Sequence, residues 1–206
     1  MARKKRNWFP GAKYHITCRG NRKAPLFEER IDRLKYFAFL EQARHVFPFR
    51  LHAYCLMTNH VHLSIETFDH PPGEIMKVLN SNYARYFNDK YEYSGHVFQG
   101  RYSAELLDSM LYEIDVSKYI HLNPVKAHMV VKPEDYAWSS YRAYFSYKKD
   151  SHAYPDYILS LFEKPAREAY RRYMHSSDPL APPELKKQLP TFSGKRIYLL
   201  TNLPEW

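Results

Sequence analysis

Two histidines, His60 and His62, stand on either side of Val61 in an apolar segment rich in strand-forming residues. Successive side chains of a β-strand point to opposite faces, so a strand would place both imidazoles on one face and Val61 on the other. Neutral imidazole is a common metal ligand. The pair therefore predicts half of a metal site, although a chain with 11 histidines also produces this spacing by chance.

A second pair with chemical potential is Tyr119 and Asn123, four residues apart in a segment with helical character. Residues at this spacing lie one above the other on a helix face. Two imidazole nitrogens and one amide oxygen would leave positions for water and phosphate oxygens, which suits Mg²⁺ or Mn²⁺ better than a closed zinc site. A histidine-triad hydrolase would instead need a histidine at position 64, where Ser64 stands.

A metal ion next to a tyrosine predicts attack of a phenol on a phosphodiester. The ion would polarise the scissile phosphate, while the Tyr119 oxygen attacks phosphorus and forms a covalent phosphotyrosine. The competing interpretation is a core aromatic, because the chain contains 19 tyrosines. Tyr83 and Tyr86 are other candidate nucleophiles, but neither has a ligand-type neighbour comparable to Asn123, so we assign them to helix packing.

The elements that must position these residues follow the order β-α-β-β-α-β. Strands are expected at 14–19, 49–57, 60–66 and within 95–107, and helices at 28–47 and 74–90. This order predicts an α+β, ferredoxin-like antiparallel sheet with both helices on one face. The first helix is expected to bury a side made of Ile31, Leu34, Phe37, Ala38 and Leu40.

A third helix is expected over residues 109–123, because Pro124 disfavours helical conformation at the residue before it. We expect this helix to cover the open face of the sheet and to bring Asn123 to the histidine pair. A short helical stretch at 133–145 and a helix at 156–175 should follow. Prolines divide the chain from about residue 148, so we expect a catalytic domain over 1–147 and a helical C-terminal extension over 148–206.

The composition favours a polyanionic partner. The formal net charge is +9, and aromatic residues make up 17% of the chain. Basic proteins of this size commonly bind nucleic acid, and aromatic side chains can stack on unpaired bases. Cys18 and Cys55 are expected to be free, buried thiols. No apolar run approaches the roughly 20 residues that a membrane helix needs, so we expect no membrane and a cytoplasmic, nucleoid-associated protein.

Several basic side chains are candidates for phosphate contacts, either because they form an N-terminal arm or because they lie near the predicted site in sequence. Each is more often a solvated surface charge than a contact. They are Arg3, Lys4, Lys5, Arg6, Arg19, Arg22, Lys23, Arg101 and Lys126.

The segment Met-Thr-Asn-His-Val-His-Leu at 57–63 resembles the His-hydrophobe-His motif of the single-tyrosine HUH transposases. The segment Tyr-Ile-His-Leu-Asn-Pro-Val-Lys-Ala at 119–127 resembles their catalytic-tyrosine helix. Segments beginning at Tyr14, Gly95 and Trp138 match the same family in the same order, so the resemblance covers residues 8–147. The most similar subgroup is the REP-associated tyrosine transposases of bacteria. Thr58 and His128 depart from the family pattern, where we expect proline and glycine.

The resemblance implies a catalytic function and a set of roles. Tyr119 would be the nucleophile, and His60, His62 and Asn123 would hold Mg²⁺ or Mn²⁺. The substrate would be single-stranded or hairpin DNA, which is cleaved and rejoined through a 5′-phosphotyrosine by a monomer or a homodimer. Two other functions stay open from the residues alone, a non-catalytic regulator that binds DNA hairpins and an RNA-processing phosphodiesterase on the same fold.

Overall fold

The computed structural model describes residues 7–146, 150 and 152–176 of the 206-residue chain. The basic arm of Arg3, Lys4, Lys5 and Arg6 lies outside the described residues. The chain forms two compact units. Unit 1 comprises Met1–Arg50 and Thr58–Leu106, and unit 2 comprises Leu51–Met57 and Leu107–Trp206. The predicted division at residue 148 marks where the family resemblance ends, and it stays a prediction.

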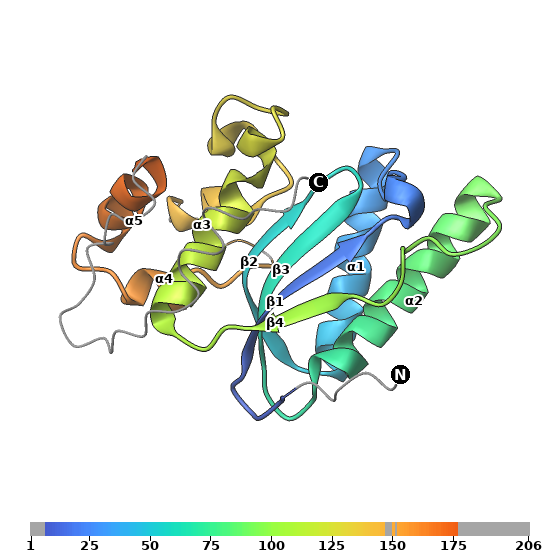
Figure 1. Ribbon diagram of the computed structural model, residues 1–206, viewed down its shortest axis with the longest axis horizontal. Helices are drawn as coiled ribbons and strands as arrows, with labels where there is room; N and C mark the ends of the chain where they lie inside the picture. The colour runs from blue at the N-terminus through green and yellow to red at the C-terminus, as the bar shows by residue number, and fades with distance from the viewer. Residues whose placement is uncertain (1–6, 147–149, 151, 177–206) are drawn as a thin grey trace. The chain divides into compact units, whose positions relative to one another are not determined.

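The described residues form one four-stranded sheet in the order β2-β3-β1-β4 (Figure 1). Strand β1 pairs antiparallel with both β3 and β4. This strand order confirms the predicted ferredoxin-like α+β fold. The strands are β1 (Lys13–Arg19), β2 (Phe49–Leu56), β3 (His60–Thr67) and β4 (Ser103–Leu106).

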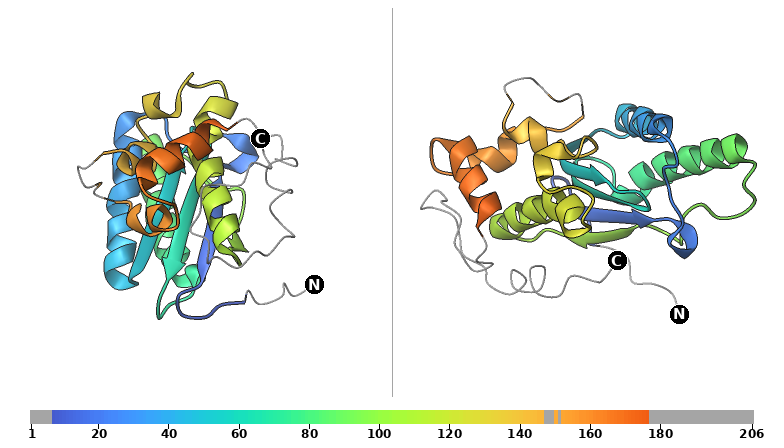
Figure 2. Two further views of the ribbon diagram at one scale, coloured as in Figure 1. Left: turned by 90° about the vertical axis from the view of Figure 1, so that its left-hand side faces the viewer. Right: turned by 90° about the horizontal axis from the view of Figure 1, so that it is seen from above.

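Two helices of unit 1, α1 (Arg30–Val46) and α2 (Pro72–Tyr91), pack against each other. Both lie on the same face of β1, β3 and β4, as Figure 1 and the right-hand view of Figure 2 show. The prediction of two helices on one face of the sheet is therefore confirmed. Helix α2 buries Ile75, Leu79, Tyr83 and Phe87, which are spaced for one helical face.

The predicted apolar side of α1 is partly wrong. Phe37 and Leu40 are buried as expected, whereas Ile31, Leu34 and Ala38 are exposed. The buried face of α1 differs from the predicted one, because it includes a polar residue, Asp32. Apolar spacing alone could not reveal a buried carboxylate.

Asp32 is buried because several donors surround its carboxylate. The backbone N–H groups of Glu28 and Glu29 donate to Oδ2 at 2.9 and 2.7 Å, and Lys90 Nζ donates to Oδ1 at 2.7 Å. The hydroxyls of Tyr86 and Tyr91 add bonds of 2.8 and 2.7 Å from α2. Burial by itself would raise the pKa of Asp32, but these bonds outweigh burial and lower the pKa to about 2. The network joins the start of α1 to the end of α2.

The fourth strand is shorter than the predicted segment. Gly100 has a φ of +153°, and the regular ladder begins only at Ser103. Before Gly100 the chain still touches the end of β1, since Asn21 N–H donates to the Val97 carbonyl and Gln99 N–H donates to the Arg19 carbonyl. The glycine thus marks an interruption of the strand.

Helix α3 (Met110–Lys126) belongs to unit 2 and begins within one residue of the predicted start, where the Ser109 side chain accepts a bond from Tyr112 N–H. The prediction that it ends at Asn123 is wrong, because the helix continues through Pro124 to Lys126. A proline inside a helix costs one backbone hydrogen bond but does not always end the helix, and here Asn123 and Pro124 are both buried within it.

The end of α3 is closed by a Schellman motif. Met129 N–H donates to the Pro124 carbonyl at 2.9 Å, and His128 N–H donates to the Val125 carbonyl at 3.0 Å. His128 has a φ of +54°, in the left-handed region that favours glycine. This conformation explains why the family pattern places a glycine at this position.

Two other predicted helices are divided in the structure. The stretch 133–145 forms two 3₁₀ helices, η2 (Pro133–Asp135) and η3 (Ser140–Tyr144). The stretch 156–175 forms α4 (Asp156–Ser160) and α5 (Ala166–His175). Helix α5 begins directly after Pro165, which lacks the N–H donor that a continuous helix would use there.

Unit 2 contains a buried polar network that anchors α3. The Tyr170 hydroxyl lies 3.1 Å from Ser117 Oγ and 2.9 Å from His121 Nδ1, and His121 Nε2 lies 2.8 Å from Ser140 Oγ. Lys118 Nζ donates to the Tyr173 carbonyl at 2.7 Å. Polar side chains of α3 therefore bind α5 and η3, and α3 is buried around most of its circumference.

Both cysteines are buried free thiols, as predicted. None of the helices in the described part of the chain is long and apolar enough to span a bilayer.

Candidate functional site

The two histidines of the predicted metal site lie at the start of β3, on the face of the sheet opposite α2. Their side is set by Val61, which pairs in register with Cys18 of β1. The Cys18 thiol accepts a 3.3 Å bond from Asn80 Nδ2 of α2, so Cys18 and Val61 face the helices. His60 and His62 therefore share the other face, as the alternation predicts. Their ring centroids are 4.9 Å apart, with the rings perpendicular.

A third histidine supports this pair. His15 Nε2 of β1 lies 3.0 Å from His62 Nδ1, and the two rings stack with centroids 5.2 Å apart. Register explains the contact: Thr17 is directly opposite His62, and His15 is two residues before Thr17 on the same face. Sequence reasoning missed His15, although strand alternation combined with the predicted β1–β3 pairing could have found it.

The hydrogen bonds at the two imidazoles favour metal binding through the Nε2 atoms. His60 Nδ1 lies 2.7 Å from Asn59 Oδ1, which accepts only if Nδ1 carries the proton. His62 Nδ1 is engaged by His15. Metal-binding histidines commonly use one nitrogen as ligand while the other is held by a neighbouring group. The donor set of β3 therefore fits a divalent cation.

Electrostatics also favour neutral imidazoles here. Burial lowers the pKa of His62 well below its usual range, and the neighbouring His15 and His60 lower it further. Burial lowers the pKa of His15 to about 4. Only a neutral imidazole can bind a metal ion, so these shifts keep the ligand form available at neutral pH.

Tyr119 and Asn123 lie one above the other on α3, as predicted. Asn123 Nδ2 donates a 2.8 Å bond to the backbone carbonyl of Tyr119. This bond uses one N–H of the amide, and it identifies the other polar atom of the side chain as Oδ1, the oxygen that a hard cation prefers. Both residues are buried, and the Tyr119 ring packs in a cluster with Val116, Ile120 and other apolar side chains of unit 2.

The structure thus brings His60 together with His62 in unit 1, and Tyr119 together with Asn123 in unit 2. Among the described residues there is no group of three His, Cys, Asp or Glu side chains that could hold a metal ion. A site on β3 therefore needs a ligand of another type, such as an amide oxygen.

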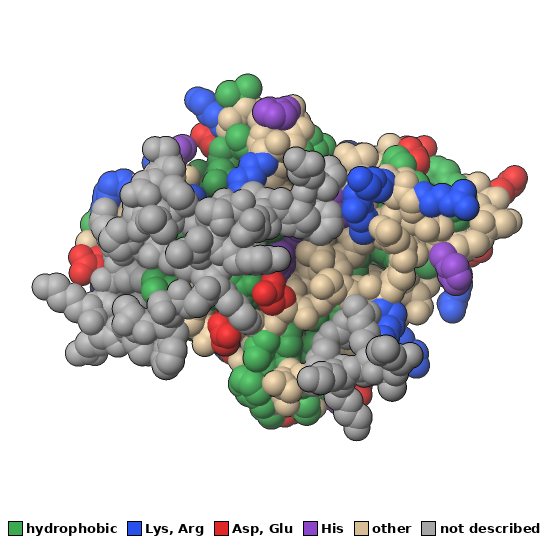
Figure 3. Space-filling view, in the orientation of Figure 1, with side chains coloured by type: hydrophobic (Ala, Val, Ile, Leu, Met, Phe, Trp, Pro, Cys, Tyr) green, Lys and Arg blue, Asp and Glu red, His purple; other side chains and the backbone are tan. Residues whose placement is uncertain are grey.

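The predicted DNA-binding residues have different surroundings. Lys126 places its ammonium 5.3 Å from the centroid of the Tyr119 ring, and burial together with the nearby Lys118 lowers its pKa. Arg22 and Lys23 are exposed on the 3₁₀ turn η1 (Asn21–Lys23), whereas Arg19 is half-buried. Arg101 is exposed and lines two hollows beside α2, of about 410 and 470 Å³. On the face in Figure 3, basic side chains are dispersed, with acidic ones between them.

A family model described as "Transposase IS200 like" matches residues 9–123, which is more than half of the chain. The protein belongs to the IS200-like transposase family. The matched residues include His60, His62, Tyr119 and Asn123. No match is found among curated proteins.

Two solved structures are similar to this transposase. A REP-associated tyrosine transposase bound to a REP hairpin has 15% sequence identity and a TM-score of 0.61, and the match covers 75% of this chain and 98% of that one. A putative transposase from Deinococcus radiodurans R1 has 14% identity and a TM-score of 0.41, with 62% and 92% covered. At 15% identity the first similarity supports the fold.

Proposed function

We propose that this IS200-like transposase cleaves and rejoins single-stranded DNA at hairpins through a 5′-phosphotyrosine intermediate. The observation that carries the proposal is the pair of buried imidazoles on β3, whose Nδ1 atoms are both engaged by neighbouring side chains. A protein that only bound DNA would not need such a pair. The hairpin substrate is proposed by analogy with the REP-associated transposase of similar fold.

A divalent cation, Mg²⁺ or Mn²⁺, would be held by His60, His62 and the amide oxygen of Asn123. When bound, it would polarise the scissile phosphate and offset the charge that develops on its oxygens. The three protein ligands provide two nitrogens and one oxygen. This set leaves coordination positions for phosphate and water, as expected for a catalytic rather than a structural ion.

Tyr119 would perform the covalent step. Its phenolic oxygen forms a bond to phosphorus, the bond from phosphorus to the 3′ oxygen breaks, and the leaving strand takes up a proton as a 3′-hydroxyl. The 5′ phosphate stays on the tyrosine. Attack by a different 3′-hydroxyl then releases Tyr119 and joins the strands, so no external energy source is needed.

The remaining residues of α3 have supporting roles in this scheme. The bond from Asn123 to the Tyr119 carbonyl couples the orientation of the third ligand to the helical turn that carries the nucleophile. The Lys126 ammonium, which lies over the Tyr119 ring, would attract the phosphate to that ring. The exposed Arg22, Lys23 and Arg101 would contribute phosphate contacts in unit 1.

The test is formation of a covalent adduct between the full-length protein and a single-stranded hairpin DNA in the presence of Mn²⁺ or Mg²⁺. We expect an adduct that resists denaturation for the wild type and none for Tyr119→Phe. Tyr112→Phe is the matched control, because Tyr112 lies on the same helix and in the same apolar cluster. This control should keep adduct formation.

Two results would contradict the proposal. An adduct that survives in Tyr119→Phe would exclude this tyrosine as nucleophile. Tight hairpin binding by the wild type with no adduct under any metal condition would favour a non-catalytic regulator. A parallel assay with the RNA version of the same hairpin identifies an RNA-processing activity, since phosphate contacts and stacking do not by themselves distinguish the sugar.

A further inference from the structure

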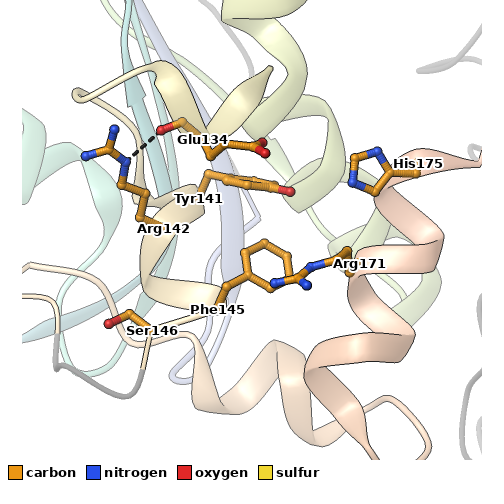
Figure 4. A pocket seen from close by; sticks show the side chains of 7 residues that line it. All are labelled: Glu134, Tyr141, Arg142, Phe145, Ser146, Arg171 and His175. Carbon is orange, nitrogen blue, oxygen red and sulfur yellow. Dashed lines mark hydrogen bonds between the residues drawn. The ribbon is translucent and has the colours of Figure 1, made fainter.

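Unit 2 contains a pocket of about 460 Å³ that the proposed chemistry does not use (Figure 4). Its lining comes from η2, η3 and the segment after it, and α5, all beyond the residues 9–123 that the family model matches. A volume of this size is typical of small-ligand sites. The lining residues are Glu134, Tyr141, Arg142, Phe145, Ser146, Arg171 and His175.

Aromatic side chains form one wall. The rings of Tyr141 and Phe145 have centroids 4.8 Å apart, and the Arg171 guanidinium lies over the Phe145 ring with its carbon 4.7 Å from the centroid. Tyr141 is buried and its ring contacts His121 of the polar network edge-on, so the wall is backed by the core of unit 2. Flat aromatic and guanidinium surfaces of this kind stack on unpaired nucleobases.

A carboxylate faces the same space. In Figure 4 the Glu134 carboxylate and the Tyr141 hydroxyl both point toward the side where His175 lies. Glu134 Oε2 is buried and has no hydrogen-bond partner among the described residues. The residue is held by its backbone, because its carbonyl accepts a 2.6 Å bond from Arg142 Nε. A buried acceptor of this kind favours a ligand that brings N–H donors.

Two arginines and a histidine complete the lining. Arg142, Arg171 and His175 are all exposed at the pocket, so its opening suits a negatively charged group such as phosphate. The ligand should therefore combine a flat aromatic body, an edge with N–H donors and an anionic group. A nucleotide has all three properties.

The carboxylate distinguishes between the bases. Adenine and cytosine place a ring acceptor next to their amino group, and thymine places carbonyls on both sides of its single ring N–H. Guanine alone offers two adjacent donors, its N1–H and its 2-amino group, which match the two oxygens of a carboxylate. The chemistry of the pocket thus favours guanine.

We infer that the pocket formed by η2, η3 and α5 binds one unpaired guanine, with its base against the surface formed by Phe145 and Arg171 and its donor edge on Glu134. That this guanine belongs to a single-stranded DNA segment rests on the proposed function. The recognition of the base itself does not. In the DNA complex the pocket would select the sequence of an unpaired segment beside the hairpin.

The experiment measures binding of the full-length protein to a fluorescent oligothymidylate of about ten nucleotides by anisotropy. Matched strands carry one central guanine, inosine or adenine. We expect the guanine strand to bind about tenfold more tightly than oligothymidylate. Inosine, which lacks the 2-amino group, should fall between them, and adenine should resemble thymine.

Variants then locate the preference. Glu134→Gln should abolish the guanine preference, because an amide replaces one acceptor oxygen by a donor. Glu168→Gln is the matched control, since Glu168 is exposed on α5, does not line the pocket and changes the net charge equally. If Glu134→Gln does not fold by circular dichroism, Arg171→Ala provides the test and should weaken guanine-strand binding about tenfold.

A guanine preference that is absent in the wild type for both the strands and guanosine monophosphate, or one that is unchanged in Glu134→Gln, overturns the inference. A preference seen with guanosine monophosphate but not with strands keeps the guanine site and assigns it to free nucleotides. The outcome is independent of the adduct assay. Loss of adduct formation with an intact guanine preference would refute the proposed function and leave the pocket, and the reverse result would refute only the pocket.

Discussion

Two fully buried histidines, His62 of β3 and His121 of α3, show how similar residues can have different roles. Neither side chain is accessible, and burial lowers the pKa of both, to about 3 for His121. His121 has a hydroxyl at each ring nitrogen, from Tyr170 and Ser140. His62 has imidazole neighbours, since it stacks on His15 and lies edge-on to His60.

The difference teaches that burial and neutrality do not identify a metal ligand. An imidazole between two hydroxyls is fully used as a donor and an acceptor, so it stabilises the fold. Each neutral imidazole of a cluster has one donor and one acceptor nitrogen, and where the donor nitrogen is held by a neighbouring group the acceptor nitrogen can bind a cation. We therefore expect substitutions at the two histidines to fail in different ways.

The largest expected effect is on activity at His62. His62→Ala should reduce adduct formation about 10³-fold, because loss of a metal ligand removes several kcal/mol of transition-state stabilisation. Circular dichroism should still show a folded protein. Adduct yield across a Mn²⁺ titration measures the effect, and full activity in this variant would show that the imidazole cluster is structural.

His121→Ala should affect stability instead. The substitution removes the imidazole that contacts the Tyr170 and Ser140 hydroxyls, and it leaves a cavity between α3, η3 and α5. The free energy of unfolding should therefore fall by about 3 kcal/mol. Urea denaturation measures the loss. His121→Asn, which can replace one of the two hydrogen bonds, should recover part of it. An unchanged unfolding midpoint would contradict the assigned role.

His15 should behave as a positioning residue for His62. His15→Ala removes the group that orients the His62 ring, so the affinity for Mn²⁺ should fall about 10–100-fold while the ligands remain. Calorimetric Mn²⁺ titration of the full-length protein measures this. The maximal rate of adduct formation at saturating Mn²⁺ should change much less than the Mn²⁺ concentration needed for half of that rate. Equal loss of both would make His15 part of the reacting centre.

The local placement of both candidate pairs was readable from the sequence, whereas the contacts around them were not. The common face of His60 and His62 follows from alternation within one strand. The common face of Tyr119 and Asn123 follows from one helical turn. His15 was missed because its contact depends on the register between two strands. The contacts of α3 with Tyr170 and Ser140 were unpredictable, since periodicity within α3 cannot reveal which distant segment offers a hydroxyl. The same reason explains the wrong face of α1, where Tyr86 and Tyr91 of another helix stabilise a buried Asp32.

Asp32 provides the contrast of a buried group that stays charged. Its pKa is lowered to about 2, and an unfolded aspartate titrates near 3.9. Its contribution to stability is therefore complete above about pH 4 and is lost as the pH falls toward 2, because the unfolded chain binds the proton first. Between these values the wild type should lose about 1.4 kcal/mol per pH unit relative to Asp32→Asn. Denaturation at a series of acid pH values measures the free energy of unfolding of the two proteins. An equal loss of this free energy with falling pH in both would contradict the prediction.

His128 is a third kind of histidine, an exposed one whose backbone, rather than its ring, matters to α3. Its φ of +54° strains any residue with a Cβ, and the Schellman bonds of the helix end require that conformation. His128→Gly should therefore raise the free energy of unfolding by about 1 kcal/mol, the strain relieved being larger than the entropy that glycine adds to the unfolded chain. His128→Ala, which keeps the Cβ, should bring no such gain. If alanine stabilised the protein as much as glycine, the imidazole and not the backbone would be the source of the cost.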